Sequence, residues 1–183
     1  MDLSAIPAFV SEDVFRVVVE TPKGSSLKLK YDPRWETMAI SRPLPFGVSY
    51  PFDWGFVPST RAADGDPLDA MLLWDIPSHP GVVVECRAIA VLRVEQNGTS
   101  HDRSRRIRND RVMSIPVEAR RQRTMEDLSS LSARVREELE QFAVAATALE
   151  GKDVTVIGWG DAAAALDLVR ESAKRPESSG RRQ

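Results

Sequence analysis

The stretch Asp64-Gly65-Asp66-Pro67-Leu68-Asp69 places three carboxylates within six residues. Gly65 permits a tight turn and Pro67 fixes its own φ, so the segment favours a turn that crowds like charges together. A hard divalent cation would relieve this repulsion, because Mg²⁺ prefers carboxylate and water oxygens as ligands. A solvated acidic turn would need no metal, and these six residues alone leave both interpretations open.

Cationic and phenolic side chains precede this acidic turn. Arg42 and Tyr50 lie just upstream, and Glu20 lies farther back. Lys28 and Lys30 share one face of an expected strand, because side chains alternate along a strand. Cations beside a carboxylate-held metal form a site for a phosphate-rich ligand. Taken one at a time, each residue has a plainer interpretation as core packing or solvated surface, but together they favour a site.

Short β-branched and alternating segments dominate the first two thirds of the chain, and helical patterns follow. We expect strands over residues 14–20, 27–31, 37–41, 70–74, 82–95, 111–116 and 153–158, with a loop over 42–67 and a polar connection over 96–109. Thr124 as N-cap, with Asp127 three residues on, and an apolar stripe from Leu128 to Leu149 predict a helix that ends at Gly151. A second helix is expected over 161–173. This order predicts a small barrel of curved sheet with helices outside, although periodicity does not distinguish a barrel from a sandwich.

The composition fits one domain of ordinary size. The chain has 183 residues, of which 42% are hydrophobic and 28% charged, enough for a real core. No apolar stretch approaches the ~20 residues of a membrane span, and the N-terminal residues show no secretory pattern. One cysteine and two histidines exclude an internal disulfide and a Cys-based zinc site. We expect a single domain over 1–174, a flexible tail over 175–183, no membrane partner and a cytoplasmic location.

Four motifs stand in order along the chain. The acidic turn reads D-G-D-P-x-D, and the segment from Glu20 to Lys28 reads E-x-P-K-G-S-x-x-K. Arg42 is followed by Tyr50-Pro51 and Trp54-Gly55-Phe56, and residues 151–159 read G-x-x-V-x-V-x-G-W. Across roughly residues 14–172 the sequence thereby resembles the soluble inorganic pyrophosphatases of family I.

The resemblance implies a fold and a reaction. Members have a mainly β fold, a five-stranded OB-type closed barrel with flanking C-terminal helices, and bacterial members are commonly hexamers. They are hydrolases acting on phosphorus anhydrides, and they split inorganic diphosphate by a metal-activated water, with Mg²⁺ as the expected metal and Mn²⁺ as the second candidate. By resemblance, Asp64 and Asp69 hold metals and Asp66 is the general base. Lys28, Arg42 and Tyr50 bind phosphate, and Glu20 orders the site from behind these residues.

Several positions depart from the family pattern. Lys30 stands where an acid is usual, and Trp54 replaces a second tyrosine, so Trp54 is expected to support the site rather than to act in it. In the hairpin, Glu95 and Asp110 are the candidate metal ligands, and Arg111 takes the position of a phosphate-binding lysine. Asn109 stands at an aspartate position. Ala146-Thr147 replaces a Tyr-Lys pair, which removes two phosphate contacts.

Three functions therefore compete. The first is a metal-dependent inorganic diphosphatase. The second is a catalytically impaired pyrophosphatase-like protein that binds a phosphorylated ligand or partner, which rests on Lys30, Asn109 and Ala146-Thr147. The third is a nucleic-acid-binding OB-type module, suggested by eight arginines in residues 103–123 against Asp110 and Glu118. That segment contains no aromatic residue, which makes nucleic acid the weakest interpretation.

Overall fold

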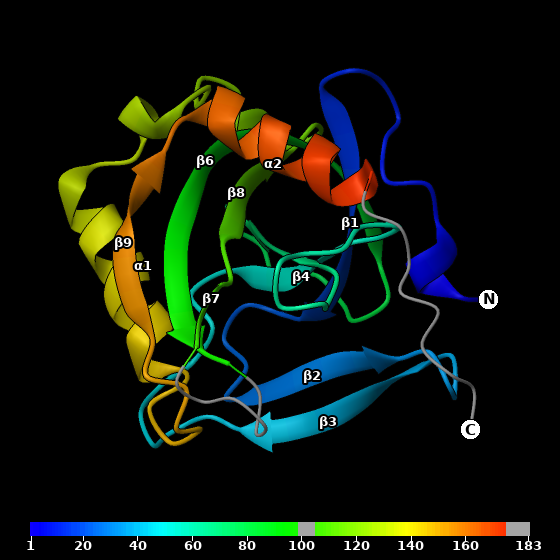
Figure 1. The fold of residues 1–183 in the computed structure, drawn as a ribbon. Coiled ribbons are helices and arrows are strands. Elements are labelled where there is room, and N and C mark those ends of the chain that lie inside the picture. Colours follow the sequence, from blue (N-terminus) through cyan, green and yellow to red (C-terminus); the bar gives the residue numbers. More distant parts are fainter. Residues whose placement is uncertain (99–104, 175–183) are drawn as a thin grey trace.

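The computed structural model describes residues 1–98 and 105–174, in which a ring of five strands forms the centre of the molecule (Figure 1). The ring runs through β1 (Val14–Thr21), β4 (Asp53–Val57), β5 (Leu68–Leu72), β8 (Arg111–Pro116) and β6 (Val83–Asn97). It closes because β6 also pairs with β1. β7 (Arg106–Arg108) and β9 (Thr155–Gly160) pair with the far half of β6. The expected mainly β architecture with two C-terminal helices is confirmed.

The long strand β6 connects the strands of this arrangement. Its first residues pair with β1, its middle with β8, and its last residues with β7 and β9. The register shifts between Ala88 and Ala90 and again between Arg93 and Val94, and such irregularities bend a strand. This bending lets one strand pair with several neighbours.

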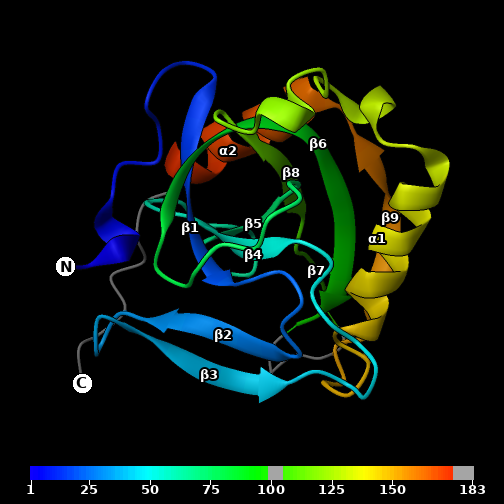
Figure 2. The ribbon, with the colours of Figure 1, turned by 180° about the vertical axis from the view of Figure 1, so that it is seen from behind.

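Two helices cover the ring from outside (Figures 1 and 2). α1 (Ala133–Ala145) contributes Leu139 and Ala143 to a core that contains Ile89 and Met113. α2 (Ala162–Lys174) contributes Ala165 and Val169 to a second core around Phe15, Val17 and Leu72. Three short 3₁₀ turns complete the described elements, at Leu3–Ala5, Arg120–Gln122 and Leu128–Ser130. In the part of the chain described, no helix is long and apolar enough to cross a membrane.

Gly55 allows β4 to lie close against β1. A Cβ atom at this position would stand 1.9 Å from the carbonyl oxygen of Val18. The close packing of β4 against β1 therefore requires glycine at this position. Gly55 also helps to position its neighbour Trp54, which lies beside the site described below.

The predicted start of the first long helix is wrong. Residues 128–130 form a 3₁₀ turn, and α1 begins after Ser132, whose Oγ accepts a hydrogen bond from the Val135 N–H at 3.2 Å. Asp127, expected to complete a capping box with Thr124, instead accepts a hydrogen bond at 2.8 Å from the N–H of Ala162, at the start of α2. The helix also ends at Ala145, before the predicted stop at Gly151.

Two segments expected to be loops contain strands. β4 lies inside the proline-rich segment 42–67, and β7 lies inside the polar connection 96–109. Tertiary pairing orders both, because β4 joins β1 to β5 and β7 pairs with the end of β6. The tail over 175–183 lies outside the described residues, and the single domain over 1–174 stays a prediction.

β2 (Leu27–Asp32) and β3 (Thr37–Pro43) form a separate two-stranded ribbon beside one end of the ring (Figure 2). The ribbon is tied to β1 through Glu20, whose carboxylate accepts a hydrogen bond from the Tyr31 N–H at 2.7 Å. This contact holds the lysine-bearing strand β2 opposite the acidic turn, and the space between them contains the site.

Candidate active site

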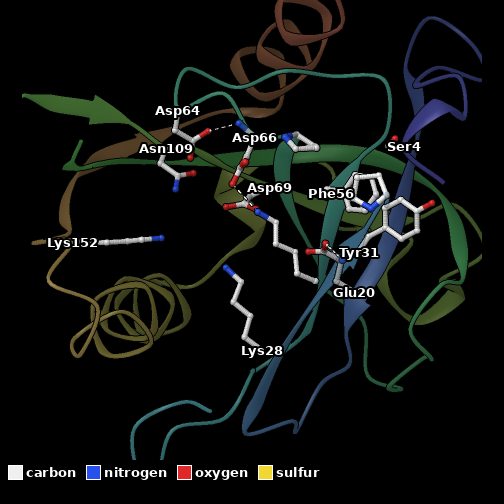
Figure 3. Close-up of a pocket in the computed structure, with 13 residues that line it drawn as sticks. Ser4, Glu20, Lys28, Tyr31, Phe56, Asp64, Asp66, Asp69, Asn109 and Lys152 are labelled. Atoms are coloured by element: carbon white, nitrogen blue, oxygen red, sulfur yellow. Dashed lines mark hydrogen bonds and ion pairs between the residues drawn. The ribbon is translucent and has the colours of Figure 1, made fainter. Parts of the chain in front are cut away.

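A cavity of about 230 Å³ lies between the ribbon and the acidic turn (Figure 3). We call it the acidic cavity, and its lining comprises Ser4, Glu20, Lys28, Lys30, Tyr31, Pro33, Phe56, Asp64, Asp66, Pro67, Asp69, Asn109 and Lys152. The three aspartates of the turn therefore meet Glu20 from β1 and two lysines from β2. The predicted common face of Lys28 and Lys30 is confirmed, because both line this cavity.

The acidic turn is closed by its own hydrogen bonds. The Asp66 N–H donates to the Asp64 carboxylate at 3.2 Å, and the Ala62 N–H donates to the Asp66 carbonyl oxygen at 2.8 Å. Gly65 has φ of 94°, the left-handed conformation that glycine tolerates best. Leu68 is buried at the start of β5, and Asp69 follows it on the opposite face. The motif thus combines a glycine turn with a strand start that directs its carboxylates into the cavity.

The carboxyl groups of this cavity are held at an electrostatic cost. Burial, and then the charge of Asp69, raise the pKa of Asp64 to about 6. Burial also raises the pKa of Asp69, and it raises the pKa of Glu20 to about 7 against the hydrogen bond from Tyr31. An added cation would oppose these shifts, because a nearby positive charge favours the ionised carboxylates. Within the described residues no three His, Cys, Asp or Glu side chains gather at one point as a ready-made metal cage. The donor set still fits a hard cation that keeps several waters, as Mg²⁺ does.

Lys30 pairs with the predicted general base. Its Nζ lies 2.8 Å from Oδ2 of Asp66, and both side chains remain partly exposed. Lys30, which departs from the family pattern, therefore lies within the site. It places a permanent positive charge beside Asp66, where the resemblance implies an acid.

A smaller hollow of about 30 Å³ adjoins the first. We call it the basic pocket, and its lining comprises Lys28, Arg42, Tyr50, Trp54, Asp69, Gln96, Asn109, Arg111, Phe142, Ala143, Ala146, Thr147 and Lys152. Lys28, Asp69, Asn109 and Lys152 line both hollows. The acidic cavity and the basic pocket are thus two halves of one site.

The predicted phosphate-binding residues meet in the basic pocket. Arg111 is only 5% exposed and lies over the Trp54 ring, 5.6 Å from its centroid. Tyr50 packs edge-on against Trp54 and Phe142, and burial raises the pKa of its hydroxyl. Arg42 forms an ion pair with Glu150 and donates to the Ala146 carbonyl oxygen at 2.8 Å. Its guanidinium is therefore partly engaged by the chain segment that follows α1.

Glu95 and Asp110, the candidate ligands of the hairpin, line neither hollow. The Asp110 carboxylate lies 2.6 Å from Nη2 of Arg108 and accepts a hydrogen bond from the Val94 N–H at 3.0 Å. Asn109 occupies the wall of both hollows instead. Its amide can offer a neutral oxygen where the family pattern has an aspartate.

The arginines of segment 103–123 serve separate purposes. Arg106 donates to Asp153 and Thr155, Arg108 pairs with Asp110, and Arg121 pairs with Asp75. Arg103 lies outside the described residues. Arg106, Arg108 and Arg121 therefore tie strands and turns together, and among the described arginines of this segment Arg111 alone lines the site described above.

Sequence reasoning missed Lys152. It lies between α1 and β9 and lines both hollows. The late G-x-x-V motif covers this position with an unspecified residue, so the motif carried no signal for it. The signal that the sequence did offer is that Lys152 directly follows Gly151. This glycine forms a turn with φ of 65°, from which the next side chain can project.

Comparison with known proteins identifies the family. A family model described as inorganic pyrophosphatase matches residues 17–177. The inorganic pyrophosphatase of Synechocystis sp. is 34% identical over 174 residues, which cover 95% of this chain and 98% of the relative. That of Thermus thermophilus is 37% identical over 166 residues, or 89% and 90% of the two chains. The crystal structure of inorganic pyrophosphatase from Thermus thermophilus aligns with a TM-score of 0.86 at 35% identity, covering 94% and 97%.

The chain belongs to the family I soluble inorganic pyrophosphatases, the inorganic diphosphatases that hydrolyse pyrophosphate to two phosphates. The family works with a divalent metal ion, typically Mg²⁺. The resemblance carried by the four sequence motifs is therefore confirmed at the level of family and reaction. The role of each residue is a separate question, which the geometry of the two hollows addresses.

Proposed function

We propose that pyrophosphate binds across both halves of the site, with its phosphates in the basic pocket and its metal ions in the acidic cavity. The observation that carries this proposal is the shared wall of Lys28, Asp69, Asn109 and Lys152. A ligand that is both anionic and metal-bound can contact the two hollows at once only if they adjoin. The separation of charge between them matches such a ligand.

Asp64 and Asp69 are the proposed metal ligands, for Mg²⁺ or Mn²⁺. Burial raises the pKa of both carboxyl groups. A bound cation would reverse this shift, because a positive charge favours the ionised form. Such an ion, when bound, lowers the pKa of water and neutralises charge on phosphate. Asn109 is better placed than Glu95 or Asp110 to add an oxygen ligand, because it lines the cavity and they do not.

Asp66 is the proposed general base. Its carboxylate is partly exposed at the cavity wall, and its pairing with Lys30 fixes one oxygen. The second oxygen stays available to accept a proton from the attacking water. Glu20 supports this arrangement by holding the backbone of Tyr31, and with it the strand that carries both lysines.

Lys28, Arg42, Tyr50 and Arg111 are the proposed phosphate-binding residues, and Trp54 is their support. Arg111 offers a planar guanidinium suited to a phosphate, held against the indole ring. Lys28 stands at the junction of the two hollows. Arg42 shares its charge with Glu150, so we assign it a smaller contribution.

Three finer features accompany this proposal. We interpret the five-strand ring as the OB-type closed barrel that the resemblance implies. Assembly into a homo-oligomer, a hexamer by family resemblance, and a cytoplasmic location also stay predictions. They rest on the family alone.

A second candidate is an impaired relative that binds pyrophosphate or a phosphorylated partner without turnover. The salt bridge between Lys30 and Asp66 favours it, because it occupies the proposed base with a cation. Phosphate release from pyrophosphate with Mg²⁺ or Mn²⁺ separates the two, measured beside Asp66→Asn as a control. Release well above that control supports catalysis. Release equal to it leaves the binding function.

A further inference from the structure

Lys152 lies close to the end of α1, where Ala146 and Thr147 stand in place of the tyrosine and the lysine of the family pattern. The end of α1 offers Ala146 and Thr147 to the basic pocket, and the Thr147 hydroxyl is engaged by the Ala143 carbonyl oxygen at 3.0 Å. This wall would therefore present no cation from the helix itself. Lys152 follows shortly after, and Figure 3 shows its side chain reaching toward the cavity from a different side than that of Lys28.

The loop around Lys152 is built to hold this position. Gly151 has φ of 65° and Asp153 has φ of 44°, so left-handed residues flank Lys152 on both sides. The Lys152 carbonyl oxygen accepts a hydrogen bond from the Asn97 N–H at 2.7 Å, and the Asp153 carbonyl oxygen accepts one from Arg106 at 2.7 Å. A non-glycine residue with positive φ is uncommon and persists only where its surroundings support it. The backbone of Lys152 is thus fixed from both neighbouring strands.

The charge of Lys152 is only partly balanced. Its Nζ lies 3.1 Å from Oε2 of Glu150, whose other oxygen pairs with Arg42. One carboxylate therefore serves two cations and leaves a net positive charge facing the site. Burial is the largest influence on the pKa of Lys28, followed by the charge of Asp69 and then by that of Lys152, which lowers this pKa. The positive charge of Lys152 also lowers the pKa of Asp64, against the larger effect of burial. Its field thus reaches residues of both halves.

We propose that Lys152 is a further substrate-binding residue, whose ammonium contacts a phosphate of pyrophosphate from the wall that α1 leaves uncharged. The proposal rests on the function proposed above and adds a residue to it. Glu150 holds Lys152 and Arg42 side by side before the substrate arrives. The substrate then offers phosphate oxygens to both cations, and Lys28 and Arg111 line the same pocket.

The test compares three variants with the wild type. Lys152→Met removes the charge and keeps most of the length, and Lys152→Arg keeps the charge. Lys174→Met is the matched control, because Lys174 is exposed at the end of α2. Steady-state phosphate release from pyrophosphate with Mg²⁺ gives kcat/KM, and calorimetric titration with imidodiphosphate and Mg²⁺ gives binding. A thermal melt of each variant checks the fold.

We expect Lys152→Met to lower kcat/KM on the order of 10- to 100-fold and to weaken imidodiphosphate binding, with Tm unchanged. Lys152→Arg should stay within a few-fold of the wild type, as should Lys174→Met. The proposal is overturned if Lys152→Met matches Lys174→Met in binding, or if Lys152→Arg loses as much as Lys152→Met. If the wild type releases no phosphate above Asp66→Asn, the catalytic proposal fails, and the imidodiphosphate titrations still decide the role of Lys152.

Discussion

The acidic cavity and the basic pocket adjoin, yet the charged side chains that line them differ in net sign. In the cavity Asp64, Asp66, Asp69 and Glu20 outnumber the lysines, and in the pocket Lys28, Arg42, Arg111 and Lys152 surround a single carboxylate. An ion pair adjoins each half. Lys30 pairs with Asp66 on one side, and Glu150 pairs with Arg42 and Lys152 on the other.

This difference indicates that the charges of the site are neutralised by the ligand that it binds. Like charges held together destabilise the folded protein, and the internal pairs relieve only part of the repulsion. The cavity is complementary to metal ions and the pocket to phosphate, which a metal–pyrophosphate complex supplies together. Changing one half should therefore affect metal binding, and changing the other should affect substrate use.

The largest expected effect is on metal binding to the acidic cavity. Asp64→Asn and Asp69→Asn should each weaken Mn²⁺ binding on the order of 100-fold, because each removes a full ligand charge from a hard-cation site. Isothermal titration with Mn²⁺ measures this, with Asp167→Asn on α2 as an exposed control. Unchanged affinity in both variants would mean that the acidic turn is only a turn.

Charge removal in the basic pocket should instead affect turnover. Lys28→Ala should lower kcat/KM on the order of 10- to 100-fold, the loss of one charge-assisted contact in the transition state. Arg42→Ala should cost less, because Glu150 already shares the charge of Arg42. Arg42→Ala should leave Mn²⁺ affinity near the wild-type value, because Arg42 lines only the basic pocket. If either variant matched the wild type in kcat/KM, that residue would be removed from the proposed site.

The two halves also differ in how well the sequence predicts them. The acidic half comes from one turn and from alternate residues of one strand, so local spacing and the family motifs identify it. The basic half joins segments near residues 42, 111 and 152, which only the folded chain brings together. Glu95 and Asp110 line neither hollow, and Arg108 and the Val94 N–H engage the Asp110 carboxylate, so metal binding by the hairpin acids stays a prediction.

The same limit applies to the fold. The alternating segments predicted most strands, because period-two burial is a local property. The start of α1 was missed because the Asp127 carboxylate binds a backbone N–H that is 35 residues away, at Ala162. β4 was missed because its two partners and Gly55 order a segment whose prolines suggest a loop. Long-range pairing decided each of these cases.

A third prediction concerns pH and the free-energy cost of burying carboxyl groups in the acidic cavity. The pKa of Glu20 is raised by burial from 4.5 to about 7, so between these values the folded protein keeps a proton that the unfolded chain has lost. The free energy of unfolding should therefore fall as the pH rises across this window, by on the order of 3 kcal/mol from this group.

Denaturant unfolding in EDTA between pH 4.5 and 7.5 measures this slope. Glu20→Gln retains an oxygen for the Tyr31 N–H and removes the titration, so its slope should be flatter than that of the wild type. Parallel slopes for the two proteins would show that Glu20 does not titrate in this range. Added Mn²⁺ should stabilise the wild type more at pH 7.5 than at pH 4.5, because metal ions bind ionised carboxylates.

The smallest effect, and the sharpest test of the boundary between the halves, concerns Lys30. Its salt bridge with Asp66 is partly exposed, so removing it should change Tm little. Lys30→Glu replaces a cation with a potential ligand beside the metal half, and it should strengthen binding of an additional Mn²⁺ and steepen the dependence of activity on Mg²⁺. Lys30→Ala should fall between this variant and the wild type.

If the ammonium stands in for a metal ion at the substrate, both variants should lose activity at low Mg²⁺, and only Lys30→Glu should recover as Mg²⁺ is raised. Superimposable Mn²⁺ titrations for all three proteins would place Lys30 outside the electrostatics of the site, and its contact with Asp66 would then have no bearing on metal binding.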